Sequence, residues 1–104
     1  MEQTFFYEAM EQTLIIHLPE ELDHHNCKNL RYETDLLMAE NYIHRLVFDF
    51  SRTTFMDSSG IGILMGRYKK VSLFGGRVLA IHVNDRLKKV MQMAGICEFI
   101  EILD

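Results

Sequence analysis

The sequence predicts an α/β domain with a mixed, mostly parallel sheet and the element order ββαβαβαβ. Runs of β-branched and aromatic residues alternate with segments in which apolar residues recur at helical spacing. This alternation is typical of parallel strands joined by right-handed helical crossovers, with the first strands added at one edge. The 104 residues match one domain, residues 1–104, and are too few for two.

Two β-rich runs open the chain. Thr4–Tyr7 and Thr13–Leu18 favour strands, and the intervening Ala9–Gln12 predicts the turn of a short antiparallel hairpin. The spacing of the apolar residues then changes to that of a helix, which we place from about His24 to Glu40. Asp23 stands where the N-cap of this helix is expected.

The middle of the chain predicts a buried strand followed by a second helix. Leu46–Phe50 is a short apolar run of the kind expected of a strand covered on both faces. The next helix should open near Asp57 and Ser58. Its predicted buried stripe consists of Ile61, Leu64, Met65 and Tyr68.

The last third predicts a strand, a helix and a final strand. Arg77–Val83 is the strand, and either Asn84 or Asp85 caps the helix, which Gly95 ends. Phe99–Ile102 is the last strand. The apolar positions of the helix are Leu87, Val90, Met91 and Ala94.

Composition and charge exclude several classes of protein. Eleven Lys and Arg against fifteen Asp and Glu give a net charge of −4, which argues against a nucleic-acid partner. No apolar run approaches the roughly 18–20 residues that span a bilayer, and the N-terminus lacks the features of a signal peptide. Cys27 and Cys97 fit no zinc or CxxC spacing, so we expect two reduced, buried thiols in a cytoplasmic protein.

The segment Asp57–Gly62 follows a predicted strand and opens a helix. Backbone N–H groups at a helix start carry partial positive charge, which stabilises an oxygen ligand or a phosphate. Two serines followed by glycine also offer an accessible hydroxyl for a kinase. The simpler interpretation, which the spacing alone favours, is that Ser58 is the N-cap of the helix.

Other chemistry fits the sequence poorly. Gly60, Gly62 and Gly66 match neither the Rossmann nor the P-loop pattern, so we expect Gly62 and Gly66 to let their helix approach the sheet closely. Adjacent helical residues point about 100° apart, so Asp23-His24-His25 is a poor start for a metal site. Ser58 lacks the G-x-S-x-G elbow of a hydrolase. We therefore predict no metal, no cofactor and no catalysis.

Three segments spread along the chain carry a family resemblance. They are Glu21–His25 at the start of the first helix, Phe55–Lys69 at the start of the second, and Met93–Ile96 at the end of the third. Together they resemble the SpoIIAA-type anti-anti-sigma factors of the STAS-domain family. The resemblance covers the whole chain and implies the STAS fold.

The resemblance also implies a protein-interaction switch rather than an enzyme. Members of this family bind an anti-sigma factor that is also a serine kinase, and so free its sigma factor. The kinase phosphorylates the first serine after the aspartate of the motif, here Ser58, and a phosphatase of the PP2C type reverses the modification. The partner-binding residues implied are Glu21, Asp23, His24, Asp57, Ser58, Ser59, Gly60 and Ile61.

The physical consequence of phosphorylation is predictable at this position. A phosphoserine adds about −1.5 to −2 charges. The helix dipole tolerates this charge, whereas Asp57 and an interface built for a neutral hydroxyl repel it. We expect a local block to binding without refolding. The alternative is a stand-alone STAS module that binds a nucleotide weakly or scaffolds a signalling assembly.

Overall fold

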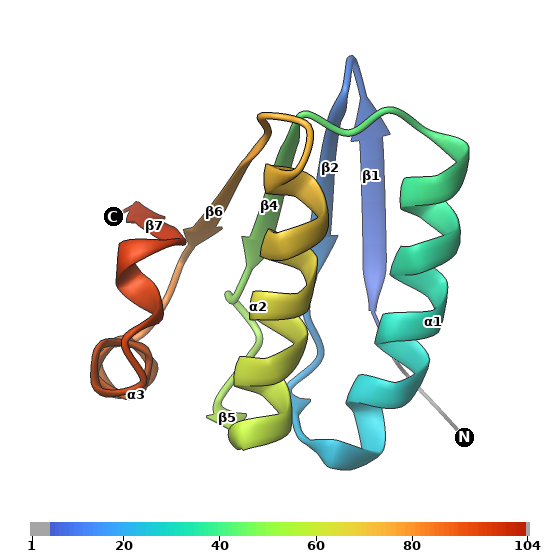
Figure 1. Ribbon diagram of the computed structural model, residues 1–104. Helices are drawn as coiled ribbons and strands as arrows, with labels where there is room; N and C mark the ends of the chain where they lie inside the picture. The colour runs from blue at the N-terminus through green and yellow to red at the C-terminus, as the bar shows by residue number, and fades with distance from the viewer. Residues whose placement is uncertain (1–4, 104) are drawn as a thin grey trace.

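The chain opens with an antiparallel hairpin. The computed structural model describes residues 5–103, and its first strands are β1 (Phe6–Met10) and β2 (Thr13–His17) (Figure 1). Glu11 and Gln12 form the turn, with φ angles of 50° and 72°, the left-handed conformation that suits a two-residue hairpin. The turn expected at Ala9–Gln12 is therefore too long, because Ala9 and Met10 pair within the hairpin. Thr4, expected in the first strand, lies outside the described residues.

Five strands form the main sheet, in the order β1-β2-β4-β6-β7. The added members are β4 (Arg45–Asp49), β6 (Arg77–Ile81) and β7 (Glu101–Leu103), and every pairing after the hairpin is parallel. The predicted mixed, mostly parallel sheet is confirmed. A separate parallel pair joins β3 (Glu21–Leu22) to β5 (Phe55–Met56). This pair was not predicted, because a strand of two residues shows no period in the sequence.

Three α-helices connect the parallel strands. They are α1 (His24–Glu40), α2 (Ser58–Ser72) and α3 (Asp85–Met93), and a 3₁₀ turn (Ile96–Glu98) follows α3. Successive crossovers step in one direction along the sheet, from β2 to β4, β6 and β7. Right-handed crossovers of this kind place all the helices on the same face. Figure 1 shows α1 and α2 side by side in front of the sheet.

The core lies between that face and the helices. Leu46 and Phe48 of β4 belong to the core cluster, together with buried residues from all three helices. Val47 and Asp49 are also buried but alternate to the other face, where no crossover helix lies. The predicted burial of this strand on both faces is confirmed, although helices cover only one.

The buried face of α2 differs from the prediction. Leu64 is fully buried as expected, but Ile61, Met65 and Tyr68 are only partly buried. The expected close packing of Gly62 and Gly66 is wrong, because no atom lies within 4 Å of a Cβ placed at either position. The helix is turned so that Leu64 is joined in the buried face by four residues that were not predicted there: Gly60, Ile63, Arg67 and Val71.

The C-terminal elements are shifted by one or two residues. Asn84 caps α3, with the Leu87 N–H donating to its Oδ1 at 2.8 Å, and Gly95 has a φ of 78° beyond the helix end, as predicted. The last strand begins at Glu101 rather than Phe99, because the 3₁₀ turn comes first. That turn also exposes Cys97, so the expectation of two buried thiols holds for Cys27 alone.

Candidate functional site at the starts of two helices

The segments that precede α1 and α2 are joined to each other. Glu21 pairs with Phe55 and Leu22 with Met56 in the β3–β5 sheet. The N–H of Asp57 also donates to the carbonyl oxygen of Leu22 at 3.3 Å. The two helices therefore start next to each other, at the lower end of the molecule in Figure 1.

One carboxylate serves both helix starts. Oδ1 of Asp57 accepts the N–H groups of Ser59 at 2.9 Å and Gly60 at 3.3 Å, which caps α2. Oδ2 of Asp57 accepts the N–H of His24, the first residue of α1, at 3.3 Å. Asp23 is the N-cap of α1, as predicted, and accepts the N–H of Asn26 at 3.0 Å.

Ser58 is not the N-cap. Asp57 takes that role, so Ser58 is the first residue of α2, and it is exposed. Its hydroxyl forms no hydrogen bond with any residue between 5 and 103. The interpretation that the spacing favoured is wrong, since the aspartate side chain already caps the helix. The hydroxyl is left free for an incoming group.

The other predicted site residues surround Ser58 with different degrees of access. Glu21 and His24 are exposed, whereas Asp23, Asp57, Ser59 and Ile61 are partly buried. Gly60 is buried, and a Cβ there would lie 2.5 Å from Cγ of Met56 and 2.7 Å from the carbonyl oxygen of Leu22. Gly60 therefore lets α2 approach β3 closely.

Two exposed residues at this end were not predicted as part of the site. Phe55 leaves 49% of its surface exposed, although it is a large apolar residue. Gly62 lies one turn after Ser58, is exposed, and presents no side chain beside it. The available signal was the alternation in Phe55-Met56-Asp57, which buries Met56 and turns Phe55 outward.

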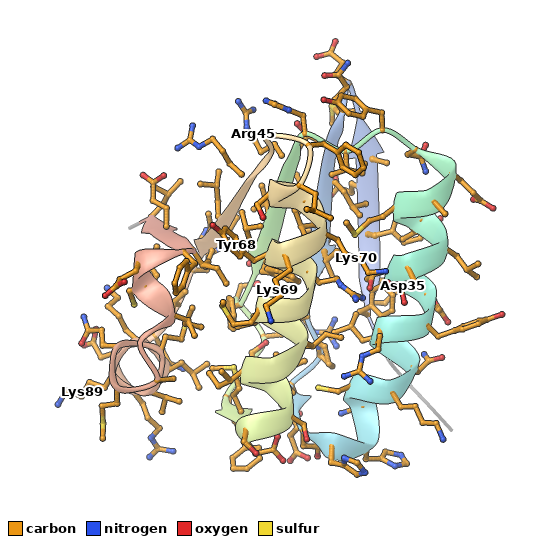
Figure 2. The ribbon with its side chains drawn as sticks, in the orientation of Figure 1. Asp35, Arg45, Tyr68, Lys69, Lys70 and Lys89 are labelled. Carbon is orange, nitrogen blue, oxygen red and sulfur yellow. The ribbon has the colours of Figure 1, made fainter. Side chains whose placement is uncertain are left out.

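Several acidic side chains lie at the starts of the two helices. Burial raises the pKa of the Cys27 thiol to about 11, and the charges of Asp57 and Asp23 act in the same direction. Glu20 and Glu21 add exposed negative charge. Figure 2 shows Arg45 at the opposite end of the molecule, and Lys69 and Lys70 along the C-terminal part of α2, where Nζ of Lys70 lies 3.1 Å from Oδ1 of Asp35.

The helix starts are poorly suited to binding a small anionic ligand. The N–H groups of Ser59 and Gly60 that would hold a phosphate already donate to Asp57, whose charge repels an anion. Within residues 5–103, no group of three His, Cys, Asp or Glu side chains is arranged to hold a metal ion. In the same part of the chain, no helix is long and apolar enough to cross a membrane.

Comparison with protein families gives a match across almost the whole chain. The model of the STAS domain matches residues 7–104. The chain belongs to the STAS-domain family. The predicted resemblance is thus confirmed, and so is the predicted fold.

Two relatives that align with most of this chain are named anti-sigma F factor antagonists. The anti-sigma F factor antagonist of Paenibacillus polymyxa is 33% identical over 91 residues, which cover 88% of this chain and 78% of the relative. The corresponding protein of Lysinibacillus sphaericus is 28% identical over 85 residues, covering 82% and 73%.

Solved structures of STAS proteins agree with this fold. The unphosphorylated form of the anti-sigma factor antagonist SpoIIAA superposes with a TM-score of 0.85 at 27% identity, covering 97% of this chain and 89% of that one. The phosphorylated form of Bacillus SpoIIAA superposes with a TM-score of 0.76, also at 27% identity, covering 97% and 92%.

Proposed function

We propose that this STAS protein is an anti-sigma factor antagonist. In its unphosphorylated form it binds an anti-sigma factor that is also a serine kinase, and so releases the sigma factor. The observation that carries the proposal is the exposed Ser58 hydroxyl, left without a hydrogen bond among the described residues because Asp57 caps the helix. The names of the relatives and the two forms of SpoIIAA support the same function.

The binding surface that we propose comprises the exposed residues Glu21, His24, Phe55, Ser58 and Gly62. Phe55 supplies an apolar contact, and aromatic residues often dominate the binding energy of protein interfaces. Glu21 supplies a negative charge for an Arg or Lys of the kinase. Gly62 leaves space for the kinase to approach Ser58 closely.

Phosphorylation adds negative charge to this surface at Ser58. The kinase transfers the γ-phosphoryl group of ATP to Oγ of Ser58, so a P–O bond to ADP breaks, a new one forms and the hydroxyl proton leaves. The product adds about −1.5 to −2 charges beside Asp57. A phosphatase of the PP2C type hydrolyses the ester and restores the hydroxyl. Because Asp57 and not Ser58 caps α2, the fold keeps its helix start throughout.

The proposal is tested by binding to the cognate kinase. We expect Ser58→Ala to bind but not to be phosphorylated, and Ser58→Glu to bind at least about tenfold more weakly, because it adds a charge to an interface that accepts a hydroxyl. Ser72→Glu, at the far end of the same helix, is the matched control and should bind like the parent. Equal binding of Ser58→Glu and parent contradicts the switch.

Two further measurements separate the alternatives. Peptide mapping after incubation with kinase and ATP should place the phosphate on Ser58, and modification of Ser59 or of no residue contradicts the proposal. Calorimetric titration with ATP, GTP and their diphosphates should show no tight binding in the absence of kinase. Tight binding there supports the alternative, a nucleotide-binding STAS module.

A further inference from the structure

An arginine is buried between α1 and α2. Arg67 of α2 leaves only 3% of its surface exposed, and arginine is almost never fully buried unless it is paired. It belongs to the same buried face of α2 as Ile63, Leu64 and Val71. An apolar residue at this position would be buried without losing the hydration of a charge, so core packing alone does not account for an arginine.

The guanidinium of Arg67 contacts three positions on one face of α1. Nη1 donates to Oγ1 of Thr34 at 2.7 Å and to the carbonyl oxygen of Arg31 at 3.2 Å. Nη2 lies 3.0 Å from Oδ1 of Asp35. These positions are spaced i, i+3 and i+4, so they share one face of the helix. Arg67 therefore contacts a particular face of α1 through directional polar groups.

The acceptor on Thr34 is held in one orientation. Thr34 is fully buried, and its hydroxyl donates to the carbonyl oxygen of Leu30 at 2.8 Å. A hydroxyl has one proton and two lone pairs, so this bond uses its proton within α1 and leaves a lone pair for Arg67. The hydrogen bond between the helices is therefore fixed in direction from both sides.

These contacts compensate the buried charge only in part. Nε of Arg67 has no hydrogen-bond partner among residues 5–103, and Oδ1 of Asp35 accepts none, so its contact with Arg67 is an ion pair alone. Burial lowers the pKa of Arg67, although the charge of Asp35 acts to raise it. Asp35 is shared with Lys70, and Figure 2 shows these two side chains meeting between the helices. Such a group is weak evidence for stability, and its better attested role is to select one arrangement of the packed elements.

The two helices that Arg67 joins both start at the proposed binding surface. α1 begins with His24 and α2 with Ser58, and Asp57 accepts the His24 N–H. That bond brings the helix starts together, but a single bond at one end does not fix the rotation of α1 about its own axis. Apolar packing is non-directional and tolerates small rotations. The contact of Arg67 with Thr34, about 15 Å further along α1, supplies the directional restraint.

We propose that Arg67 is a positioning residue, which holds one face of α1 against α2 and so sets the direction of His24 relative to Ser58. The inference rests on the proposed function, because both residues belong to the surface proposed to bind the kinase. A partner that contacts both helix starts binds only those molecules in which both are in place. If about a tenth of the molecules have this arrangement, the apparent affinity falls about tenfold.

Arg67→Met tests the proposal, because methionine is long, flexible and apolar and can fill the same space. The variant leaves no buried charge without a partner, since Asp35 keeps Lys70 and the Thr34 hydroxyl still donates within α1. We expect a midpoint of urea unfolding close to that of the parent and kinase binding about tenfold weaker. Lys70→Met, which removes the exposed partner of the same carboxylate, is the matched control and should bind like the parent.

NMR relaxation tests the positioning without the kinase. In Arg67→Met, the amide resonances of His24 and Ser58 should broaden through exchange on the µs–ms timescale, because α1 samples more than one rotation. In Lys70→Met, the same resonances should match those of the parent. A residue that only fills space would change resonances close to itself and leave the helix starts unaffected.

Failure of this inference is distinguishable from failure of the proposed function. If the parent does not bind the kinase, the proposed function is wrong, and the NMR comparison still decides the role of Arg67. If the parent binds and Arg67→Met binds equally well, or if its helix-start resonances match the parent's, the inference is wrong. Should circular dichroism show that Arg67→Met is unfolded, Thr34→Val, which removes one hydroxyl, takes its place in both measurements. Thr34→Val should then weaken binding and broaden the same resonances, and a result equal to the parent overturns the inference.

Discussion

Oδ2 of Asp57 accepts the backbone N–H of His24 at 3.3 Å, although the two residues are 33 positions apart in the chain. The other oxygen of the same carboxylate caps α2. The starts of α1 and α2 are thus held together by the residue directly before Ser58. The geometry around the proposed phosphorylation site depends on this one side chain.

Asp57→Ala should destabilise the protein by about 1–2 kcal/mol, because loss of an N-cap leaves backbone N–H groups of α2 without a partner and also frees the His24 N–H. Asp23→Ala, which removes the cap of α1 alone, should cost about 1 kcal/mol or less. Urea unfolding followed by circular dichroism measures both. Asp57→Asn keeps the oxygen that accepts from Ser59 and should recover most of the loss. A smaller loss of stability for Asp57→Ala than for Asp23→Ala contradicts the role of Asp57 at both helix starts.

Much of the fold was predictable from the sequence, because it rests on local patterns. The helix His24–Glu40 was predicted to the residue, since Asp23 provides an N-cap and the apolar residues keep a clear period. The residue that caps α2 was not predictable in the same way. Asp57 and Ser58 are both good N-caps by residue type, and only the path of the chain out of β5 decides between them.

Contacts between distant segments account for the remaining errors. No local signal shows that Glu21 pairs with Phe55, so the sheet that joins the two helix starts was missed. The roles of the glycines depend on the same contact. A Cβ at Gly60 would meet β3, whereas a Cβ at Gly62 or Gly66 would lie more than 4 Å from every other element, and only the position of α2 on the sheet separates these cases.

The two glycines Gly60 and Gly62 should respond oppositely to alanine. Gly60→Ala places a methyl group 2.7 Å from the carbonyl oxygen of Leu22, which belongs to the backbone and yields little, so we expect a loss of about 1–3 kcal/mol. Gly62→Ala meets nothing and gains helix propensity, so the protein should become more stable by about 0.5–1 kcal/mol. Thermal and urea unfolding compare the pair. Equal effects of the two substitutions contradict the placement of α2.

The two cysteines should react at different rates with a thiol reagent. Cys97 is exposed on the 3₁₀ turn, whereas Cys27 is buried and has its pKa raised to about 11. The thiolate is the reactive form, so Cys27 is protected both by burial and by protonation at neutral pH. We expect one thiol to react promptly in the native protein and the second only after unfolding in urea. Cys97→Ser should remove the prompt phase, and prompt reaction of both thiols contradicts the burial of Cys27.

The protonation of His17 should make stability depend on pH. Its two ring nitrogens each lie 2.7 Å from a carboxylate oxygen, and ionised carboxylates only accept hydrogen bonds, so both nitrogens donate at once only in the protonated ring. The hydrogen bond with Glu8, and then that with Asp49, raise the pKa of His17 above its usual 6.5. This stabilisation is complete below the unfolded pKa and is lost as the pH rises through the higher folded pKa.

Asp49 sets the acid limit of the same stabilisation. Burial acts to raise the pKa of Asp49, but hydrogen bonds from His82, His17 and Ser51 outweigh it, so the pKa falls below its usual 3.8. The contribution of Asp49 is present above that value and is lost as the pH falls through the lower folded pKa. The two groups together stabilise the protein most between about pH 4 and 6.5.

Urea unfolding measured at intervals from pH 5 to pH 8 (on the order of half a unit apart) tests this account. The free energy of unfolding should fall on the alkaline side in the parent, and the fall should be much smaller in His17→Gln, whose side chain does not titrate. His25→Gln removes an exposed histidine from the start of α1 and should keep the parent's pH dependence. An NMR titration of the imidazole resonances should place the midpoint of His17 above 6.5. A midpoint below that value, or a parent and His17→Gln with identical pH profiles, means that His17 does not hold its proton between Glu8 and Asp49.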